Sequence, residues 1–375
     1  MARLALFLPS LAGGGAERVL VDLAEGFARR GHRVDLVLAA AEGPYLKTLS
    51  EAVNVIDLGV RRTLSATPKL RAYLTKTKPD ALLSTLEHAN VVAVLANKLA
   101  GSATKVFIRE AISTSNSTMD LGKAKAFVAM SLMRLFYPRA DGIVAVSEGV
   151  QEDMVKTLGV KPEKIEMILN PVLTERVFKL ADEPLDHPWF QTEIPVLLSV
   201  GRLTYQKDFP TLLKAFARLR AKRQVRLVIL GEGEERDKLE QIASDLEITA
   251  DLDMPGFVDN PFKYMARASA YVLSSIAEGL PNALIQAMAL GRPVVATDCP
   301  SGPREILEGG RYGKLIPMGD VEAMTKALTQ VLSEPHKAMS DDWVRRYEAE
   351  TVISQYLEFM AVTPVPEKQA LGAHS

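Results

Sequence analysis

Two basic residues, Arg202 and Lys207, lie five positions apart in a short loop that could do chemistry. The loop begins at Gly201 and follows the apolar segment Val196–Val200, so we expect it at the carboxyl end of a buried strand. An arginine can hold an anion through two hydrogen bonds, and a lysine adds a compact point charge. Together they could neutralise a diphosphate leaving group. The alternative is a pair of solvated loop cations.

A second loop whose residues could take part in catalysis or binding is the run Glu278-Gly279-Leu280-Pro281-Asn282. It follows a predicted strand. Pro281 suits the first turn of a helix, and the backbone N–H groups of this run could hold phosphate oxygens. Gln286 lies eight positions after Glu278, so we expect both side chains to reach one ligand. The alternative for Glu278 is simple helix capping.

A glycine run, Gly13-Gly14-Gly15, follows the first apolar segment and opens a predicted helix containing Glu17 and Arg18. Consecutive glycines let the backbone approach a phosphate or a sugar, and a helix N-terminus favours negative charge. The dinucleotide fingerprint fails because Arg18 stands where its third glycine belongs, which disfavours a nicotinamide dehydrogenase. A tight strand-to-helix turn is the alternative.

The elements that must position these loops alternate between short apolar runs and amphipathic helical periods. This alternation, which occurs twice, predicts α/β domains whose parallel sheets are covered on both faces. Such sheets bind ligands outside the carboxyl ends of their strands. The predicted strands are 4–8, 34–38, 81–84, 105–108 and 143–146, then 196–200, 226–230, 270–273, 293–296 and 314–316.

The chain length of 375 residues, at about 150 per domain, predicts two domains. A proline-containing stretch without periodicity between Asn170 and Trp189 is the expected linker. We therefore expect an N-terminal Rossmann-like domain over 1–172 and a second over 173–340, facing a central cleft. Residues 341–360 would form a C-terminal helix that returns to the first domain, and 361–375 a disordered tail.

Composition narrows the class of protein. Apolar residues make up 47% of the chain and the net charge is −1, so nothing global favours a nucleic-acid partner. The single cysteine, Cys299, excludes an intramolecular disulfide and a cysteine-based zinc site. No apolar stretch approaches the roughly 20 residues of a membrane span, and the first residues are typical of a buried strand rather than a signal peptide. We expect a cytoplasmic protein, either free or peripheral on the inner face of the plasma membrane.

Several of these motifs, taken in order, resemble those of a known family. The glycine run through Arg18, the Gly201–Lys207 loop and the Glu278–Gln286 segment are similar to signatures of the retaining family-four glycosyltransferases, which have the GT-B fold. The runs Asp259-Asn260-Pro261-Phe262 and 298–307 resemble bacterial members that act in surface-polysaccharide assembly. The resemblance extends to about residue 360.

The resemblance implies a role for each second-domain motif. Arg202 and Lys207 would hold the donor diphosphate, and Glu278 would contact hydroxyls of the transferred sugar. Gln286 stands where the family's E-x7-E motif has a glutamate that binds the nucleotide ribose. The other implied donor-binding positions of this domain are Gly201, Val258, Gly279, Leu280, Pro281 and Asn282.

The resemblance also implies roles for first-domain residues. Gly14 and Gly15 would approach the donor, and His88 would lie beside the donor sugar, although it could equally cap the following helix. Glu110 and Glu17 would face the acceptor. In this family the nucleoside diphosphate leaves and the acceptor hydroxyl attacks the same face, without a protein nucleophile.

We expect no cofactor and no metal. The D-x-D spacing of Asp251 and Asp253 is used by metal-dependent glycosyltransferases of the GT-A class, but a turn before a strand is favoured here. The partners would be a nucleotide-sugar donor, with UDP as the expected nucleotide, and a glycan or polyprenyl-diphosphate-linked acceptor. The apolar stretch 123–137, with cations at both ends, could dock on anionic lipid, although an ordinary helix packed on the sheet is favoured.

The prediction is therefore a retaining hexosyl- or N-acetylhexosaminyl-transferase of cell-surface polysaccharide biosynthesis. Two alternatives stay open. One is a nucleotide-sugar epimerase of the same fold, and the other is a catalytically weak sugar-nucleotide-binding protein, which the substitution at Gln286 motivates.

Overall fold

The computed structural model describes residues 1–114, 122–335 and 337–362, which form two compact units. Unit 1 comprises Met1–Pro171 and Arg346–Ser375, and unit 2 comprises Val172–Arg345. The division falls one residue before the expected boundary at 172. The expected helix 341–360 is instead two helices: Asp341–Tyr347 begins in unit 2, and Ala349–Phe359 belongs with unit 1. Most of the expected tail, 363–375, lies outside the described residues.

Unit 1 is built on a seven-stranded parallel sheet with the order β3-β2-β1-β4-β5-β6-β7. The central strands are continuous apolar runs because helices cover both faces of the sheet. The strands are β1 (Arg3–Leu8), β2 (Arg33–Leu38), β3 (Val53–Asp57), β4 (Ala81–Thr85), β5 (Lys105–Glu110), β6 (Gly142–Ala145) and β7 (Ile165–Met167).

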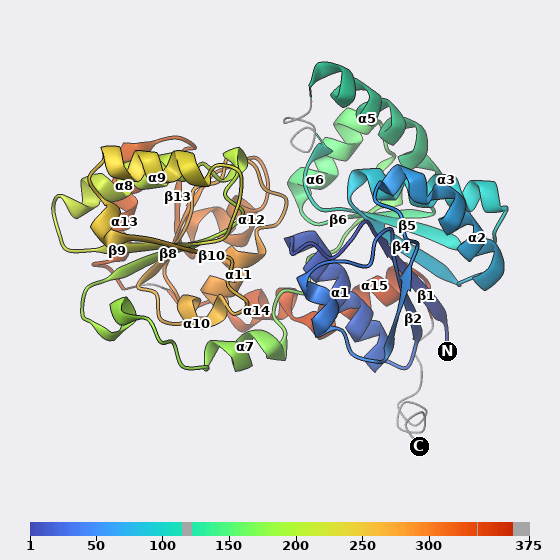
Figure 1. Ribbon diagram of the computed structural model, residues 1–375, viewed down its shortest axis with the longest axis horizontal. Coiled ribbons are helices and arrows are strands. Elements are labelled where there is room, and N and C mark those ends of the chain that lie inside the picture. The colour runs from blue at the N-terminus through green and yellow to red at the C-terminus, as the bar shows by residue number, and fades with distance from the viewer. Residues whose placement is uncertain (115–121, 336, 363–375) are drawn as a thin grey trace. The chain divides into compact units, whose positions relative to one another are not determined.

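The helices of unit 1 include the last helix of the described chain, α15 (Ala349–Phe359), which packs beside α1 (Gly15–Arg29) (Figure 1). Gly26 permits this approach, because a Cβ there would overlap the side chain of Ile353. One core cluster joins β1, β2, α1 and α15. Further α-helices in the described part of unit 1 are α2 (Thr67–Thr77), α3 (Glu87–Ala100), α5 (Lys123–Phe136) and α6 (Glu148–Asp153).

Unit 2 is built on a six-stranded parallel sheet with the order β10-β9-β8-β11-β12-β13. Its inner strands are again short apolar runs and are almost fully buried. They are β8 (Val196–Val200), β9 (Arg226–Leu230), β10 (Leu252–Gly256), β11 (Ala270–Leu273), β12 (Val294–Thr297) and β13 (Lys314–Ile316).

The helices of unit 2 form two layers. On one face α8 (Phe209–Arg220), α9 (Arg236–Asp245) and α13 (Val321–Val331) bury their apolar stripes against the sheet (Figure 1). The other helices are α7 (Glu175–Ala181), α10 (Phe262–Met265), α11 (Asn282–Ala289), α12 (Pro303–Ile306) and α14 (Asp341–Tyr347). Among the helices that the structure describes, none is long and apolar enough to cross a membrane.

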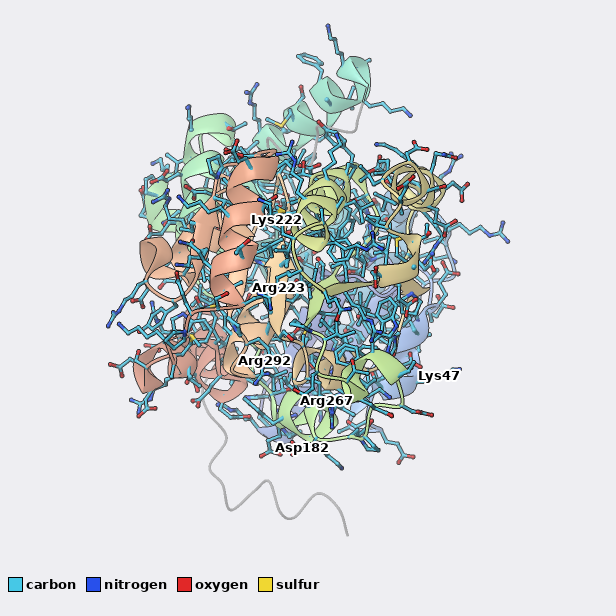
Figure 2. The ribbon with its side chains drawn as sticks, turned by 90° about the vertical axis from the view of Figure 1, so that its left-hand side faces the viewer. Lys47, Asp182, Lys222, Arg223, Arg267 and Arg292 are labelled. Atoms are coloured by element: carbon cyan, nitrogen blue, oxygen red, sulfur yellow. The ribbon has the colours of Figure 1, made fainter. Side chains whose placement is uncertain are left out.

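The amino and carboxyl ends of the unit 2 strands carry different residues. Arg223 precedes β9, Arg267 precedes β11 and Arg292 precedes β12, so these arginines mark the amino ends of the strands. Figure 2 shows all three, together with Lys222, on one face of the unit. The loops singled out by their sequence follow the strands instead, and therefore lie at the carboxyl ends.

Ten strands lie where the apolar runs predict them, and β3, β7 and β10 were missed. The missed strands are edge strands with exposed or half-exposed residues, so they lack the continuous apolar run that marks a buried strand. Pro281 also differs from expectation, because it precedes α11 rather than lying in its first turn. Helix ends are the least certain feature of such a prediction, since propensity changes little over one residue.

Candidate active site

The site in unit 2 lies where the strand order reverses. Strand β8 has β9 on one side and β11 on the other, which makes the carboxyl end of β8 a topological switch point. Ligands of open parallel sheets bind at such points because the flanking loops diverge there. The Gly201–Asp208 loop follows β8 and the 274–281 loop follows β11, so the fold brings the two predicted donor loops together.

The loop after β8 holds its two cations differently. The Arg202 side chain is exposed and makes no hydrogen bond or ion pair with any residue that the structure describes. Lys207 is half-buried at the end of a short 3-10 turn. Asp208 follows in a left-handed conformation, with φ of 42°, and its carboxylate accepts a hydrogen bond from the N–H of Thr211 at the start of α8. The loop is therefore anchored directly after Lys207.

Lys207 and Glu278 form an ion pair. Nζ of Lys207 lies 2.5 Å from Oε1 of Glu278, and the Ser275 hydroxyl donates to the same oxygen at 2.6 Å. Glu278 is 8% exposed. Glu278 does not cap α11, so the capping alternative is wrong. Of the two loop cations, Lys207 is paired with Glu278, whereas Arg202 is exposed.

Hydrogen bonds also join the backbones of the two loops. The N–H of Ile276 donates to the carbonyl of Gln206 at 2.9 Å, and the Ser274 hydroxyl donates to the carbonyl of Lys207 at 2.6 Å. These bonds hold the loops after β8 and β11 together. The ion pair is therefore preorganised by the fold.

The loop after β12 completes the surroundings of Glu278. The Ser301 hydroxyl donates to the backbone carbonyl of Glu278 at 2.6 Å. Gly302 has a φ of 89°, and a Cβ there would lie 2.6 Å from Cδ of Pro281 and 2.8 Å from the carbonyl of Gly279. A larger residue at position 302 would push this loop away from the site.

Sequence reasoning assigned no role to Ser275, Ser301 or Gly302. Ser275 carries a usable signal, because it belongs to a serine pair that directly follows a buried strand. The contact between Ser301 and Glu278 joins loops after two different strands, so only the tertiary structure shows it.

Two other predicted donor-binding positions lie on or after other elements than the two loops that carry the ion pair. Gln286 is half-buried on α11, and its amide has no hydrogen-bond partner among the described residues. Val258 follows the edge strand β10, which β9 separates from β8. Gly279, Leu280 and Pro281 are contiguous with Glu278, and Asn282 begins α11.

Unit 1 has its own switch point, between β1 and β4. The glycine run follows β1, with Gly14 in the position that precedes α1. A Cβ on Gly14 would overlap the carboxylate of Glu17, so that carboxylate lies over the loop. The Tyr45 hydroxyl donates to the carbonyl of Gly13 at 3.1 Å and fixes the turn. The structure thus brings Gly14, Gly15 and Glu17 together.

His88 lies in the first turn of α3, which follows β4 and therefore flanks the same switch point. Its ring is exposed and does not cap the helix, so the capping alternative is wrong. Leu86, two residues earlier, has a φ of 76°, an unusual value for a residue with a branched side chain. Residues with strained backbone conformations are common at functional sites, where the surrounding structure holds them in place.

Glu110 ends β5, the strand next to β4, and lies beneath the surface rather than on it. It is 1% exposed, and its Oε2 accepts a 2.6 Å hydrogen bond from the Tyr137 hydroxyl. Burial, assisted by the charge of Glu87, raises the pKa of Glu110 to about 8. The prediction that this residue faces an acceptor is therefore not supported by exposure in the described structure.

The two aspartates of the D-x-D spacing are engaged in ion pairs or hydrogen bonds. Asp251 pairs with Arg220, and Oδ2 of Asp253 lies 3.0 Å from Nε2 of His187. The 1–114, 122–335 and 337–362 ranges contain no cluster of three or more histidine, cysteine, aspartate or glutamate side chains suited to a metal. Metal independence stays a prediction.

Comparison with known proteins gives the class. Residues 13–176 match Glycosyltransferase Family 4, and residues 187–348 match Glycosyl transferases group 1. The chain belongs to the glycosyltransferase family that these two models describe, one for each half of the chain. The family resemblance of its motifs is confirmed. Its two parallel-sheet Rossmann-like units are those of the GT-B fold, and the protein is a glycosyltransferase.

Two bacterial relatives are named as glycosyltransferases. The N-acetylgalactosamine-N,N'-diacetylbacillosaminyl-diphospho-undecaprenol 4-alpha-N-acetylgalactosaminyltransferase of Campylobacter jejuni is 29% identical over 342 residues, covering 89% of this chain and 91% of the relative. The lipopolysaccharide core biosynthesis glycosyltransferase LpsE of Rhizobium meliloti is 28% identical, covering 94% and 97%. HepE of Anabaena, solved with UDP and glucose, has a TM-score of 0.71 at 21% identity and covers 96% of each chain.

Proposed function

We propose that this glycosyltransferase moves a hexosyl or N-acetylhexosaminyl group from a UDP-sugar to a glycan or polyprenyl-diphosphate-linked acceptor, with retention of configuration, in cell-surface polysaccharide biosynthesis. The observation that carries the proposal is the Lys207–Glu278 pair at the switch point of unit 2. Arg202, in the same loop, has no hydrogen-bond or ion-pair partner among the described residues. The C. jejuni and R. meliloti relatives support the substrate class through their names.

The chemistry that the proposal requires is stabilisation of a leaving diphosphate and recognition of a sugar. Arg202 is exposed and free to bind phosphate oxygens through its fork of N–H groups. Glu278 is an ionisable acceptor that would take hydrogen bonds from sugar hydroxyls. Positioning and electrostatic stabilisation would supply the rate enhancement, and no protein nucleophile or metal is invoked.

The first unit would contribute from its glycine run and from His88. The carboxylate of Glu17 lies over Gly14, so the start of α1 already has a negative charge above it. That charge favours an uncharged hydroxyl-rich partner, such as an acceptor sugar, over a phosphate at this position. The exposed ring of His88 is free to hydrogen-bond a sugar hydroxyl.

Two alternatives bear on the proposal. The nucleotide-sugar epimerase finds no support in the comparisons. The binding-protein alternative rests on Gln286, and the preorganised Lys207–Glu278 pair argues against it, because a site that only held a nucleotide would not need that pair.

We also propose that the enzyme works at an anionic membrane surface through α5. The helix exposes three apolar side chains, Phe127 at 72%, Val128 at 56% and Leu135 at 47%, and Met133 is its buried residue. An ordinary helix packed on a sheet would bury such side chains, so the exposure favours lipid over the packing alternative. The cations near them are Lys123, Lys125, Arg134 and Arg139.

The test of the proposed function is a screen of UDP-, GDP- and ADP-sugars by thermal shift, followed by product analysis. A binding sugar nucleotide should raise the melting temperature, because ligand that binds only the native state stabilises it. UDP release and a product in which the anomeric configuration of the donor is kept, read by NMR, would support the proposal. A product with inverted anomeric configuration would overturn the proposal. Binding of sugar nucleotides with no transfer to a polyprenyl-diphosphate-linked saccharide or glycan would also overturn it.

A further inference from the structure

The carboxylate of Glu278 presents two oxygens with different surroundings. Oε1 accepts from both Lys207 and Ser275, at 2.5 and 2.6 Å. Oε2 accepts no hydrogen bond from any residue in the described part of the chain. One oxygen is thus occupied by the protein, and the other is left for a ligand.

Ser275 is itself held in place. It is completely buried, and the Thr297 hydroxyl donates to its backbone carbonyl. The next residue, Ile276, donates its N–H across to the loop after β8. The backbone of Ser275 is therefore held in place, three residues before the carboxylate that its hydroxyl binds.

Lysine alone would not select one oxygen. Its ammonium is a point charge on a flexible four-carbon stem and can approach either carboxylate oxygen. A serine three residues away has a short side chain and one hydroxyl hydrogen, so its bond fixes the rotation of the carboxylate. Lys207 thus supplies the charge and Ser275 the orientation, which explains why both donate to Oε1 of Glu278.

We propose that Ser275 is a positioning residue that fixes the Glu278 carboxylate so that Oε2 alone meets a hydroxyl of the donor sugar. The inference rests on the proposed function, since it takes Glu278 as the residue that contacts the sugar.

The experiment compares Ser275→Ala and Ser275→Thr with a matched control, Ser199→Ala. Ser199 is also buried in unit 2, and its hydroxyl donates to the carbonyl of Val272 at 2.8 Å, away from Glu278. Turnover is measured as UDP release, with water as the acceptor of the sugar, from UDP-glucose, UDP-galactose, UDP-GlcNAc and UDP-GalNAc. We expect Ser275→Ala to lower kcat about tenfold with KM changed less than threefold, as loss of a bond to a charged group implies.

A double-mutant cycle separates positioning from folding. In a Glu278→Gln background, Ser275→Ala should change kcat by less than twofold, because the carboxylate that it orients is gone. Ser275→Thr keeps the hydroxyl and should recover most of the turnover, whereas Ser199→Ala should lower the melting temperature and leave kcat within twofold of wild type.

Three outcomes would overturn the inference: Ser275→Ala with full kcat, equal kcat losses in Ser275→Ala and Ser199→Ala, or additive losses in the cycle. These differ from failure of the proposed function, in which the wild-type protein itself releases no UDP from any of the four donors.

Discussion

The hydroxyl of Tyr137 donates a 2.6 Å hydrogen bond to Oε2 of Glu110, and both side chains are fully buried in unit 1. The amide of Asn90 donates in turn to the Tyr137 oxygen at 3.2 Å. Burial raises the pKa of Glu110 to about 8, with Glu87 adding to the rise and Tyr137 and Arg109 opposing it. The carboxyl is therefore mostly protonated at neutral pH.

This pKa predicts how the stability of the protein depends on pH. Between the ordinary glutamate pKa and about 8, the folded protein holds a proton on Glu110 that the unfolded chain has lost. The contribution of Glu110 to the free energy of unfolding therefore falls as pH rises through this window, by up to about 1.4 kcal/mol per pH unit.

The measurement compares wild type with Glu110→Gln, whose amide oxygen can still accept from Tyr137, in denaturant unfolding from pH 5 to 8. The variant should gain stability relative to wild type as pH rises. A difference between the two proteins that stays constant over this range would show that the folded carboxyl titrates normally.

Arg202 is expected to carry the electrostatic stabilisation of the leaving group. Arg202→Ala should lower kcat roughly 10²- to 10³-fold, the range for removing a stabiliser of developing charge, and leave the melting temperature unchanged because the side chain is exposed. Lys207→Ala should also abolish most transfer, and it should lower stability because Glu278 loses its partner.

The control for both variants is Lys222→Ala, an exposed cation on the opposite, amino-end side of the unit 2 sheet (Figure 2). It should keep full activity. EDTA should have little effect on the wild-type protein. Full activity of Arg202→Ala, or complete loss of activity in EDTA, would contradict a metal-free site built on this cation.

Gln286 predicts a modest affinity for the donor. A charge-assisted hydrogen bond contributes about 1.5–3 kcal/mol against about 1 kcal/mol for a neutral one, so a carboxylate should bind a ribose diol more tightly than an amide. Gln286→Glu should lower the donor KM roughly threefold to tenfold with little change in kcat. Glu278→Gln should instead lower chiefly kcat.

Gln330→Glu, which adds the same charge on α13, is the control for Gln286→Glu and should leave the donor KM unchanged. A higher KM in Gln286→Glu would mean that this residue does not contact the ribose. A wild type without turnover that becomes active in Gln286→Glu would favour the binding-protein alternative.

The rate at which the Cys299 thiol is labelled should report on the folding of unit 2. Burial raises its pKa to about 12, and the residue is 3% exposed. Because the thiolate is the reactive form, a disulfide reagent such as DTNB should label the native protein slowly at pH 8 and the unfolded protein at once.

A bound UDP-sugar should slow this labelling further, because the loop that carries Cys299 also carries Ser301, whose hydroxyl bonds to Glu278. The Cys299→Ala variant supplies the unlabelled baseline. Labelling of the native protein as fast as that of the unfolded chain would contradict the burial of this thiol.

The α5 surface predicts salt-sensitive binding to anionic vesicles. Exchanging its four cations for glutamine should release the protein from phosphatidylglycerol-containing vesicles, and Phe127→Ser should weaken binding even at low salt. Sedimentation with vesicles measures both effects. A charge-matched control changes four unit 2 cations to glutamine: Lys214, Arg218, Lys222 and Arg223.

The control variant should bind vesicles like wild type. Binding that ignores salt, or that survives the α5 substitutions, would contradict the membrane proposal. Equal loss in the control variant would show that net charge, rather than the α5 surface, attracts the protein to lipid.

The sequence alone determined the class of fold and the loops that matter. Runs such as Val196–Val200 and Ala270–Leu273 are continuous and apolar because both faces of these strands are covered, so composition marks them without any structure. Edge strands such as β3 were missed because their outer residues face solvent. The motifs after the buried strands indicated the family, and the family was confirmed.

The tertiary structure decided how those residues act on one another. The Lys207–Glu278 pair joins positions 71 residues apart, and its geometry depends on β8 and β11 being neighbours, which no local pattern specifies. The same is true of Ser275 on Oε1 of Glu278 and of the burial of Glu110 beneath Tyr137. Local sequence sets which strand a side chain follows, but pairing order and packing set its neighbours, its burial and therefore its pKa.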